Sequence, residues 1–135
     1  MDVTPDELAA AVMAELEAYT DEAIAGVKKA VDDVAKEARA EIKKHAEFGG
    51  TGEYVKAFRL KTTMEDRTSK VKTWYVAAPH YRLTHLLEHG HIVVRDGRAV
   101  GRAKAYPHIK YGAELVEREL PKRIEEVLGG DTASD

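Results

Sequence analysis

The chain has 135 residues, of which 44% are hydrophobic and 33% charged, and it has no cysteine. This length predicts one domain with a modest core, and the lack of cysteine excludes thiolate metal sites, cysteine nucleophiles and disulfides. The acidic first residues contain no apolar signal segment, and no run approaches the roughly 18 to 20 apolar residues of a membrane span. We therefore expect a soluble protein without a membrane partner.

The net charge of −3 is distributed unevenly along the chain. Residues 1–47 carry 12 acidic and 6 basic side chains, residues 48–112 carry 5 and 12, and residues 113–135 carry 7 and 3. An acidic, a basic and a second acidic segment therefore follow one another. This pattern is compatible with nucleic-acid binding, with contact between oppositely charged faces of two copies, or with neutralisation inside one chain.

The first 47 residues predict one long amphipathic helix. Thr4 is the expected N-cap and Pro5 the first helical residue. Apolar side chains then recur at alternating spacings of three and four, which marks one helix face. They are Leu8, Val12, Leu16, Tyr19, Ile24, Val27, Val31, Val34, Ala38 and Ile42.

A helix from about residue 5 to residue 46 would be roughly 60 Å long, twice the width of a domain of this size. It must therefore overhang the domain or bend, and Gly26 is the expected break. An overhanging apolar stripe needs a second chain to cover it. Leu8, Val12 and Leu16 are accordingly the predicted interface residues at this end.

The middle of the chain predicts a small antiparallel sheet after a glycine-rich joint at residues 48–52. Residues 54–61 alternate polar and apolar side chains, and residues 71–76 are β-branched and aromatic,. The polar residues 62–70 are the expected connecting loop, which we expect to be mobile.

Residues 81–88 predict a short helix that Gly90 ends. Residues 92–95 predict a further strand that turns at Asp96-Gly97, a common hairpin signal.

Pro107 is expected to start the C-terminal helix, which Pro121 should kink or interrupt and Gly129-Gly130 should end. The prediction is thus an α+β fold in a single domain, residues 1–130. It consists of a long N-terminal helix (1–47), a sheet with a short helix (48–112) and a C-terminal helix packed on the sheet (113–130). Residues 131–135 are the expected disordered tail.

Five of the six histidines lie between His80 and His108. Among them, His85-Leu86-Leu87-Glu88-His89 matches the His-x-x-Glu-His pattern of inverted zinc peptidases, in which two histidines bind Zn²⁺ and the glutamate activates a water. Gly90 would leave the second ligand on a fraying turn, and the sequence offers no distinctive third ligand. We therefore predict no catalytic residue, metal or cofactor, and keep a zinc hydrolase using His85 and His89 as an alternative. The other histidines are expected to be packed or surface residues bonded to the backbone.

Basic residues after the predicted strand suggest a second alternative, a DNA-binding module. They are Arg95, Arg98, Arg102, Lys104 and Lys110, interleaved with Tyr106 and Tyr111. A basic hairpin could contact phosphates, but no recognised nucleic-acid module and no regular series of stacking aromatics is present. Arg98, Arg102 and Lys104 are instead predicted interface residues, with only non-specific proximity to DNA.

The block from Pro79 to His91, PHYRLTHLLEHGH, resembles the gene-product-ten-like tail-component family of long-tailed phages. The same order of motifs continues with Gly97-Arg98-Ala99-Val100 and Pro107-His108-Ile109, and Thr51-Gly52-x-Tyr54 resembles the family's turn after the first helix. The resemblance extends over residues 4–128. The chain departs from the family pattern at residues 47–50 and 110–112, outside this block.

The resemblance implies a non-enzymatic structural protein of the virion, involved in tail completion or head–tail joining. On this basis we expect a ring of copies, six if it follows the symmetry of phage tails, that contacts neighbouring neck or tail proteins and passes through the host cytoplasm during assembly. The resemblance also implies that His85 and Glu88 hold the short helix against the sheet rather than perform chemistry.

Overall fold

The computed structural model describes residues 10–15, 19–46 and 52–133. The elements follow in the order β1 (Ala10–Glu15), α1 (Asp21–His45), α2 (Glu53–Lys56), β2 (Phe58–Glu65), β3 (Ser69–Val76), α3 (Tyr81–His89), β4 (His91–Arg95), β5 (Arg98–Ala103) and α4 (Ile109–Ala133). The predicted α+β class is confirmed. None of the described helices has the length and apolar content of a membrane span.

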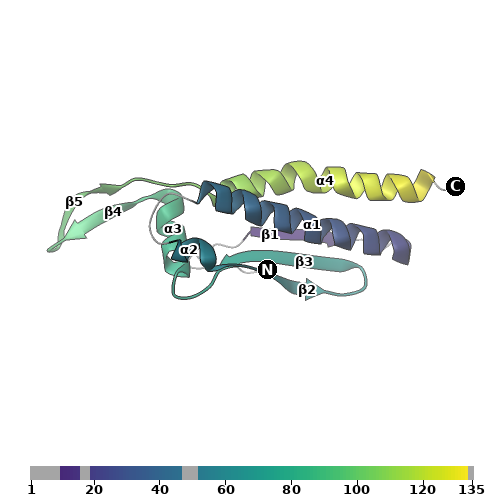
Figure 1. The fold of residues 1–135 in the computed structure, drawn as a ribbon, viewed down its shortest axis with the longest axis horizontal. Coiled ribbons are helices and arrows are strands. Elements are labelled where there is room, and N and C mark those ends of the chain that lie inside the picture. Colours follow the sequence, from purple (N-terminus) through teal and green to yellow (C-terminus); the bar gives the residue numbers. More distant parts are fainter. Residues whose placement is uncertain (1–9, 16–18, 47–51, 134–135) are drawn as a thin grey trace.

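The molecule has two parts, which we call the body and the arm. The body contains the helices α1 and α4 and the antiparallel sheet in the order β1-β3-β2, with β3 in the centre. The arm is the separate two-stranded hairpin β4–β5, which projects beyond one end of the elongated body (Figure 1). The short helices α2 and α3 lie between them.

Helix α1 begins at a typical N-cap. The Thr20 hydroxyl oxygen accepts a hydrogen bond from the Ala23 N–H at 3.1 Å, and Asp21 and Glu22 place negative charge in the first turn. Lysines in the last turn complement the opposite end of the helix dipole,. The local sequence therefore explains where this helix starts.

The prediction of a helix before residue 19 is wrong for residues 10–15, which form strand β1. This strand pairs with β3 over its whole length, from Ala10 opposite Trp74 to Glu15 opposite Ser69. Its alanines favour a helix locally. Pairing with the central strand overrides that preference, because strand formation depends on tertiary partners more than on intrinsic propensity.

Helix α1 is therefore shorter than predicted, with 25 residues and a length of about 38 Å,. Thr4 and Pro5, its predicted start, lie outside the described residues. The helix also runs without a break through Gly26. A Cβ atom at Gly26 would lie 2.8 Å from Val127 Cγ1, so this glycine allows α4 to approach closely rather than breaking α1.

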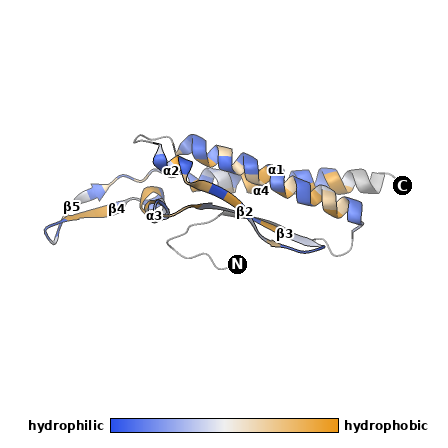
Figure 2. Ribbon diagram, turned by 60° about the horizontal axis from the view of Figure 1, so that its bottom comes forward, coloured by the Kyte–Doolittle hydropathy of each residue, from blue (hydrophilic) through white to orange (hydrophobic). Residues whose placement is uncertain are grey.

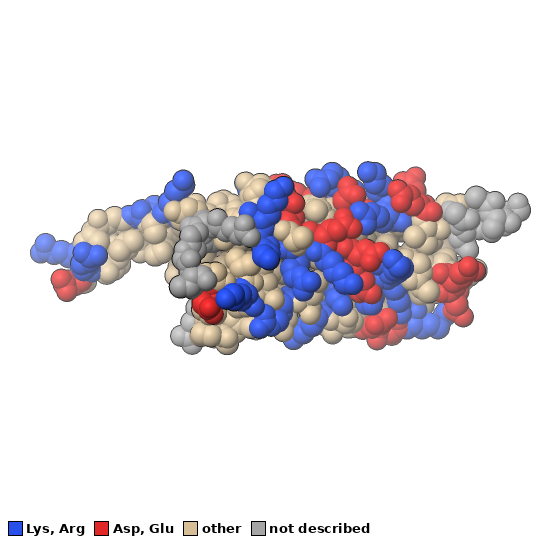
Figure 3. Space-filling view, in the orientation of Figure 1, with Lys and Arg blue, Asp and Glu red and all other residues tan. Residues whose placement is uncertain are grey.

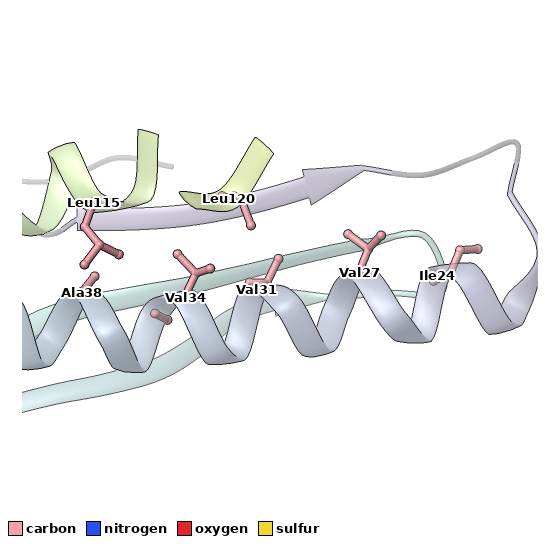
Figure 4. Close-up of a cluster of buried hydrophobic side chains, with 8 residues drawn as sticks. Ile24, Val27, Val31, Val34, Ala38, Leu115 and Leu120 are labelled. Carbon is pink, nitrogen blue, oxygen red and sulfur yellow. The ribbon is translucent and has the colours of Figure 1, made fainter. Parts of the chain in front are cut away.

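The apolar stripe of α1 packs against α4 within the same chain (Figure 4). Val27, Val31 and Val34 have no exposed surface. The buried cluster consists of Ile24, Val27, Val31, Val34, Ala35, Ala38, Leu115 and Leu120. The prediction that an overhanging part of this stripe awaits a second chain is thus wrong for the described helix.

The two helices are antiparallel, and their other end is also closely packed. A Cβ atom at Gly112 of α4 would lie 2.5 Å from Ile42 Cγ1 and 3.2 Å from the Ala38 carbonyl oxygen of α1. Helix α4 packs chiefly on α1 and reaches the sheet at β1. It continues through Pro121, so the predicted interruption there is wrong.

The predicted stop at Gly129-Gly130 is also wrong, because α4 extends to Ala133. A glycine in a helix costs only about 1 kcal/mol relative to alanine, and helix hydrogen bonds on both sides can offset this cost.

A second cluster lies where the sheet meets the end of α1. Its centre is Trp74, which is 2% exposed and packs edge-to-face on Phe58 with 4.9 Å between ring centroids. The other buried members are Ile42, Ala46, Ala57 and Val76. This cluster anchors the end of the body from which the arm projects.

The strand and loop boundaries in the middle of the chain differ from the prediction. Residues 53–56 form the helical turn α2, which Gly52 enters with a φ of 82°, so β2 begins only at Phe58. The predicted loop over residues 62–70 is reduced to a tight turn. In this turn the Asp66 carboxylate accepts a hydrogen bond from the Thr68 N–H at 3.0 Å, and such Asx turns connect strands without a long loop.

Candidate functional site

The block that carries the family resemblance forms α3 and its junctions with the arm and with α4. Helix α3 ends at Gly90 as predicted, with a φ of 73°. A Cβ atom at Gly90 would lie 2.8 Å from the Ala103 carbonyl oxygen, where β5 leaves the arm. Glycine is required here both for the positive φ and for the close approach of the returning chain.

Glu88 of α3 caps the first turn of α4. Its carboxylate accepts hydrogen bonds from three consecutive backbone N–H groups, those of His108 at 2.8 Å, Ile109 at 3.0 Å and Lys110 at 3.2 Å. The first N–H groups of a helix have no partner within the helix and carry the positive end of its dipole. A side chain 20 residues earlier in the chain thus fixes where α4 starts.

His108 is completely buried beside this carboxylate. Its Nδ1 lies 3.0 Å from Glu88 Oε1 and 2.8 Å from the Tyr106 carbonyl oxygen. Because both neighbours are acceptors, Nδ1 carries the proton. The Nε2 atom is hydrogen-bonded to the Tyr54 hydroxyl at 2.7 Å, and that hydroxyl also lies 3.2 Å from Thr84 Oγ1.

Tyr54, Thr84, Glu88 and His108 form what we call the polar cluster. Burial raises the pKa of Glu88, but the hydrogen bonds from the His108 side chain and the backbone outweigh it and lower the pKa to about 2,. Burial also raises the pKa of Tyr54, to about 12. Near neutral pH the cluster therefore contains an ionised Glu88 and an un-ionised Tyr54.

The geometry of the polar cluster suits a structural role. Tyr54 comes from α2, Thr84 and Glu88 from α3, and His108 from the residue before α4. These hydrogen bonds join the body, α3 and the chain returning from the arm. Buried polar networks whose members are satisfied favour one arrangement of the elements that they connect.

The zinc-site alternative is not supported by the positions of its residues. The His85 and His89 rings lie on the exposed face of α3 with centroids 5.1 Å apart. Glu88, the required general base, is occupied in capping α4. Across the described residues, no group of three side chains suited to metal binding occurs.

The resemblance implied that His85 and Glu88 hold α3 against the sheet. In the structure, Glu88 contacts the start of α4 instead of the sheet, and the His85 side chain is exposed. His108 is bonded to backbone, as expected for a packed histidine. Sequence reasoning missed Tyr54 and Thr84, although both belong to motifs quoted for the resemblance.

The arm has the predicted hairpin turn, with positive φ at both Asp96 (53°) and Gly97 (76°),. Its strands are largely exposed, and three branched apolar side chains lie in solvent, Ile92 at 58%, Val94 at 63% and Val100 at 56% exposure. Figure 2 shows the hydrophobic colouring of β4 on the projecting hairpin.

The predicted interface residues lie in different parts of the molecule. Arg98 and Arg102 are on β5, and Lys104 follows it directly, with Nζ 5.7 Å from the Tyr106 ring centroid. Val12 belongs to β1, opposite Lys72 of β3. Leu8 and Leu16 lie outside the described residues. The structure therefore brings together the three basic candidates on or beside the arm and separates them from Val12.

An open groove of about 490 Å³ lies at the other end of the body. Its lining is mainly apolar and comes from the segment before α1 and the second half of α4. The lining residues are Tyr19, Pro121, Ile124, Glu125, Leu128 and Gly129. No sequence motif marks this groove, because its two walls are about 100 residues apart in the chain.

The fold thus combines a packed body, a buried polar cluster and an exposed hairpin, an arrangement suited to a structural subunit. Residues 10–90 match the family described as "Bacteriophage HK97-gp10, putative tail-component". The chain belongs to this family of phage tail components, as the resemblance indicated. Searches of curated proteins and of solved structures gave no match.

Proposed function

We propose that the protein is a non-enzymatic tail component that assembles with further copies of itself into a ring at the head–tail junction of a phage. Six copies would match the symmetry of phage tails. The ring would contact neighbouring neck or tail proteins, assemble in the host cytoplasm and become part of the virion. Membership of the tail-component family supports a role in the phage tail.

The observation that carries the assembly role is the arm. A two-stranded hairpin alone is marginally stable in water, and clustered exposed apolar side chains on a small protein commonly mark a contact surface. Ile92, Val94 and Val100 are more than half exposed on such a hairpin. A partner that covers them would explain why the chain maintains this projection.

The charge pattern supports assembly through the arm rather than through those charged side chains of α1 that already pair within the chain. Within one chain, Asp32 of α1 binds Lys70 of β3 at 2.9 Å and lies 3.5 Å from Lys72. Glu37 of α1 forms a two-fold ion pair with Arg123 of α4, with both N–O distances 2.7 Å. Neutralisation inside the chain therefore uses much of the charge that the sequence offered for contacts between copies.

The arginines of the arm remain available. Among the described residues, Arg95, Arg98 and Arg102 have no ion-pair partner. Figure 3 shows mainly basic side chains on the arm, and acidic side chains together with basic ones at the opposite end of the body. We propose that the acidic-to-basic contact between copies involves these two ends.

Light scattering over a range of protein concentrations, together with negative-stain electron microscopy, tests the assembly. We expect closed rings whose formation is weakened, but not abolished, by high salt, because salt screens exposed charges and leaves apolar contacts intact. A monomer at every concentration and salt level would refute the proposal.

The two alternatives have simple tests of their own. Metal analysis of protein purified without chelator should find no bound zinc in proportion to protein. DNA retention at low salt should be weak and should disappear as the salt concentration rises, as for non-specific phosphate contacts.

A further inference from the structure

Two apolar side chains and one basic side chain of the arm share one face. Ile92 and Val94 are two residues apart on β4, so they lie on the same side of the hairpin. Arg102 is directly opposite Ile92 in the strand register and therefore lies on that side too,. The exposed face of the arm thus presents two branched apolar side chains with an arginine beside them.

The groove of the body has the complementary character. Ile124 and Leu128 supply apolar surface, and the exposed residue Glu125 also belongs to the lining. Glu22 and Glu126, at the same end of the helix pair, are exposed and have no ion-pair partner among the described residues. This end therefore offers an apolar groove that contains Glu125, with two further exposed glutamates at the same end of the helix pair.

We propose that the arm of one copy docks into the groove of the next copy, with Ile92 and Val94 against Ile124 and Leu128 and with Arg102 near Glu125. This inference rests on the proposed self-assembly and names the surfaces that produce it.

The arm and the second half of α4 lie at opposite ends of the elongated molecule (Figure 1), and the second half of α4 supplies most of the residues that line the groove. A contact between two different surfaces of identical chains repeats from copy to copy and closes into a ring when the rotation between copies permits. An arm that paired with the arm of a second copy would give only a two-fold dimer. Docking of the arm at the opposite end is therefore the mode that leads from this shape to a ring.

The absence of native cysteine allows a direct test with introduced thiols. Val94→Cys and Leu128→Cys are made as separate single variants of the full chain. Light scattering first establishes whether each variant assembles. The two variants are then mixed and oxidised. The expected product is a crosslinked dimer of one Val94→Cys chain with one Leu128→Cys chain. A chain carrying both substitutions should form a ladder of crosslinked multimers. Ala40→Cys, on an exposed position of α1, replaces Leu128→Cys in the matched control.

The outcomes separate the docking mode from the assembly itself. Crosslinking of Val94→Cys to itself, or equally to Ala40→Cys, in an assembled protein would overturn the docking and leave the ring proposal standing. Assemblies without any Val94-to-Leu128 crosslink would do the same. A protein that stays monomeric under all conditions would overturn both proposals.

Charge reversal provides an independent test of the proposed contact between Arg102 of one copy and Glu125 of the next. Arg102→Glu and Glu125→Arg should each raise the concentration needed for half-assembly on the order of tenfold, and the double variant should recover most of this loss. Both side chains are exposed, so each variant should keep the thermal stability of the monomer. Additive losses in the double variant would contradict a contact between these two residues.

Discussion

The body and the arm use the same kind of residue for opposite purposes. Val31 of α1 is fully buried, whereas Val94 of β4 is 63% exposed. Both belong to regular secondary structure, so the difference lies in what covers each element. The body covers its apolar side chains with other parts of the same chain, and the arm leaves Ile92, Val94 and Val100 more than half exposed. Stability and assembly are therefore expected to respond to changes in different regions.

The same substitution in both regions gives the largest contrast. Val31→Asp places an unpaired carboxylate in the core and should cost at least about 4 kcal/mol of unfolding free energy, enough to unfold a marginally stable domain. Val94→Asp should change that free energy by less than about 0.5 kcal/mol, because it lies on the surface. Chemical denaturation measures both, and light scattering should show lost assembly for Val94→Asp. Equal destabilisation by the two variants would contradict the comparison.

Glycine-to-alanine substitutions test the same difference between the body and the arm at positions without a side chain. Gly112→Ala would place a Cβ atom 2.5 Å from Ile42 Cγ1, and because Ile42 is fully buried and cannot yield, we expect a loss of about 3 kcal/mol,. The matched change in the arm is Gly101→Ala, where no atom lies within 4 Å of the new Cβ. Its melting temperature should equal that of the unchanged protein. A tolerated Gly112→Ala would show that α1 and α4 can separate without cost.

The polar cluster connects the two regions, and its effect should depend on pH. The pKa of Glu88 is lowered from 4.5 to about 2 in the folded chain. Its contribution to stability is therefore fully present above pH 4.5 and is lost as the pH falls towards 2. With allowance for solvent screening, this contribution is about 2 kcal/mol.

Glu88→Gln should reduce the stability difference between pH 6 and pH 2.5 by about that amount, as measured by urea denaturation at each pH. The pKa of Asp32 is also lowered, because the opposing effect of burial is outweighed by Lys70 and Lys72, and Arg123 lowers the pKa of Glu37. The variant should therefore keep part of its acid sensitivity. An unchanged difference between the two pH values would show that Glu88 is not stabilised as its contacts indicate.

A purely local effect is expected at the tip of the arm. Gly97→Ala forces a side chain into a φ of 76° and should destabilise the hairpin by about 1 kcal/mol,. Because the arm makes little contact with the body core, global unfolding should not change. Hydrogen exchange should accelerate in β4 and β5 alone. Faster exchange throughout α1 would show that the arm and the body unfold together.

The sequence by itself determined the features that depend on neighbouring residues. The buried positions from Ile24 to Ile42 follow the spacing of one helix face, and Gly90 and Asp96-Gly97 supply the positive φ values that their turns require,. It also determined the family, because the block from Pro79 to His91 is continuous in the chain. Each of these features is encoded within a few residues, so no knowledge of distant contacts was needed.

Only the tertiary structure decided the features that depend on distant partners. Residues 10–15 have the composition of a helix and form a strand because β3 offers an edge to pair with,. Tyr54 and His108 are 54 residues apart and meet through a hydrogen bond that no local pattern encodes. That the arm and the groove lie at opposite ends of the molecule is likewise visible only in the folded chain. Such relations arise when separate elements pack together, which is a property of the whole fold.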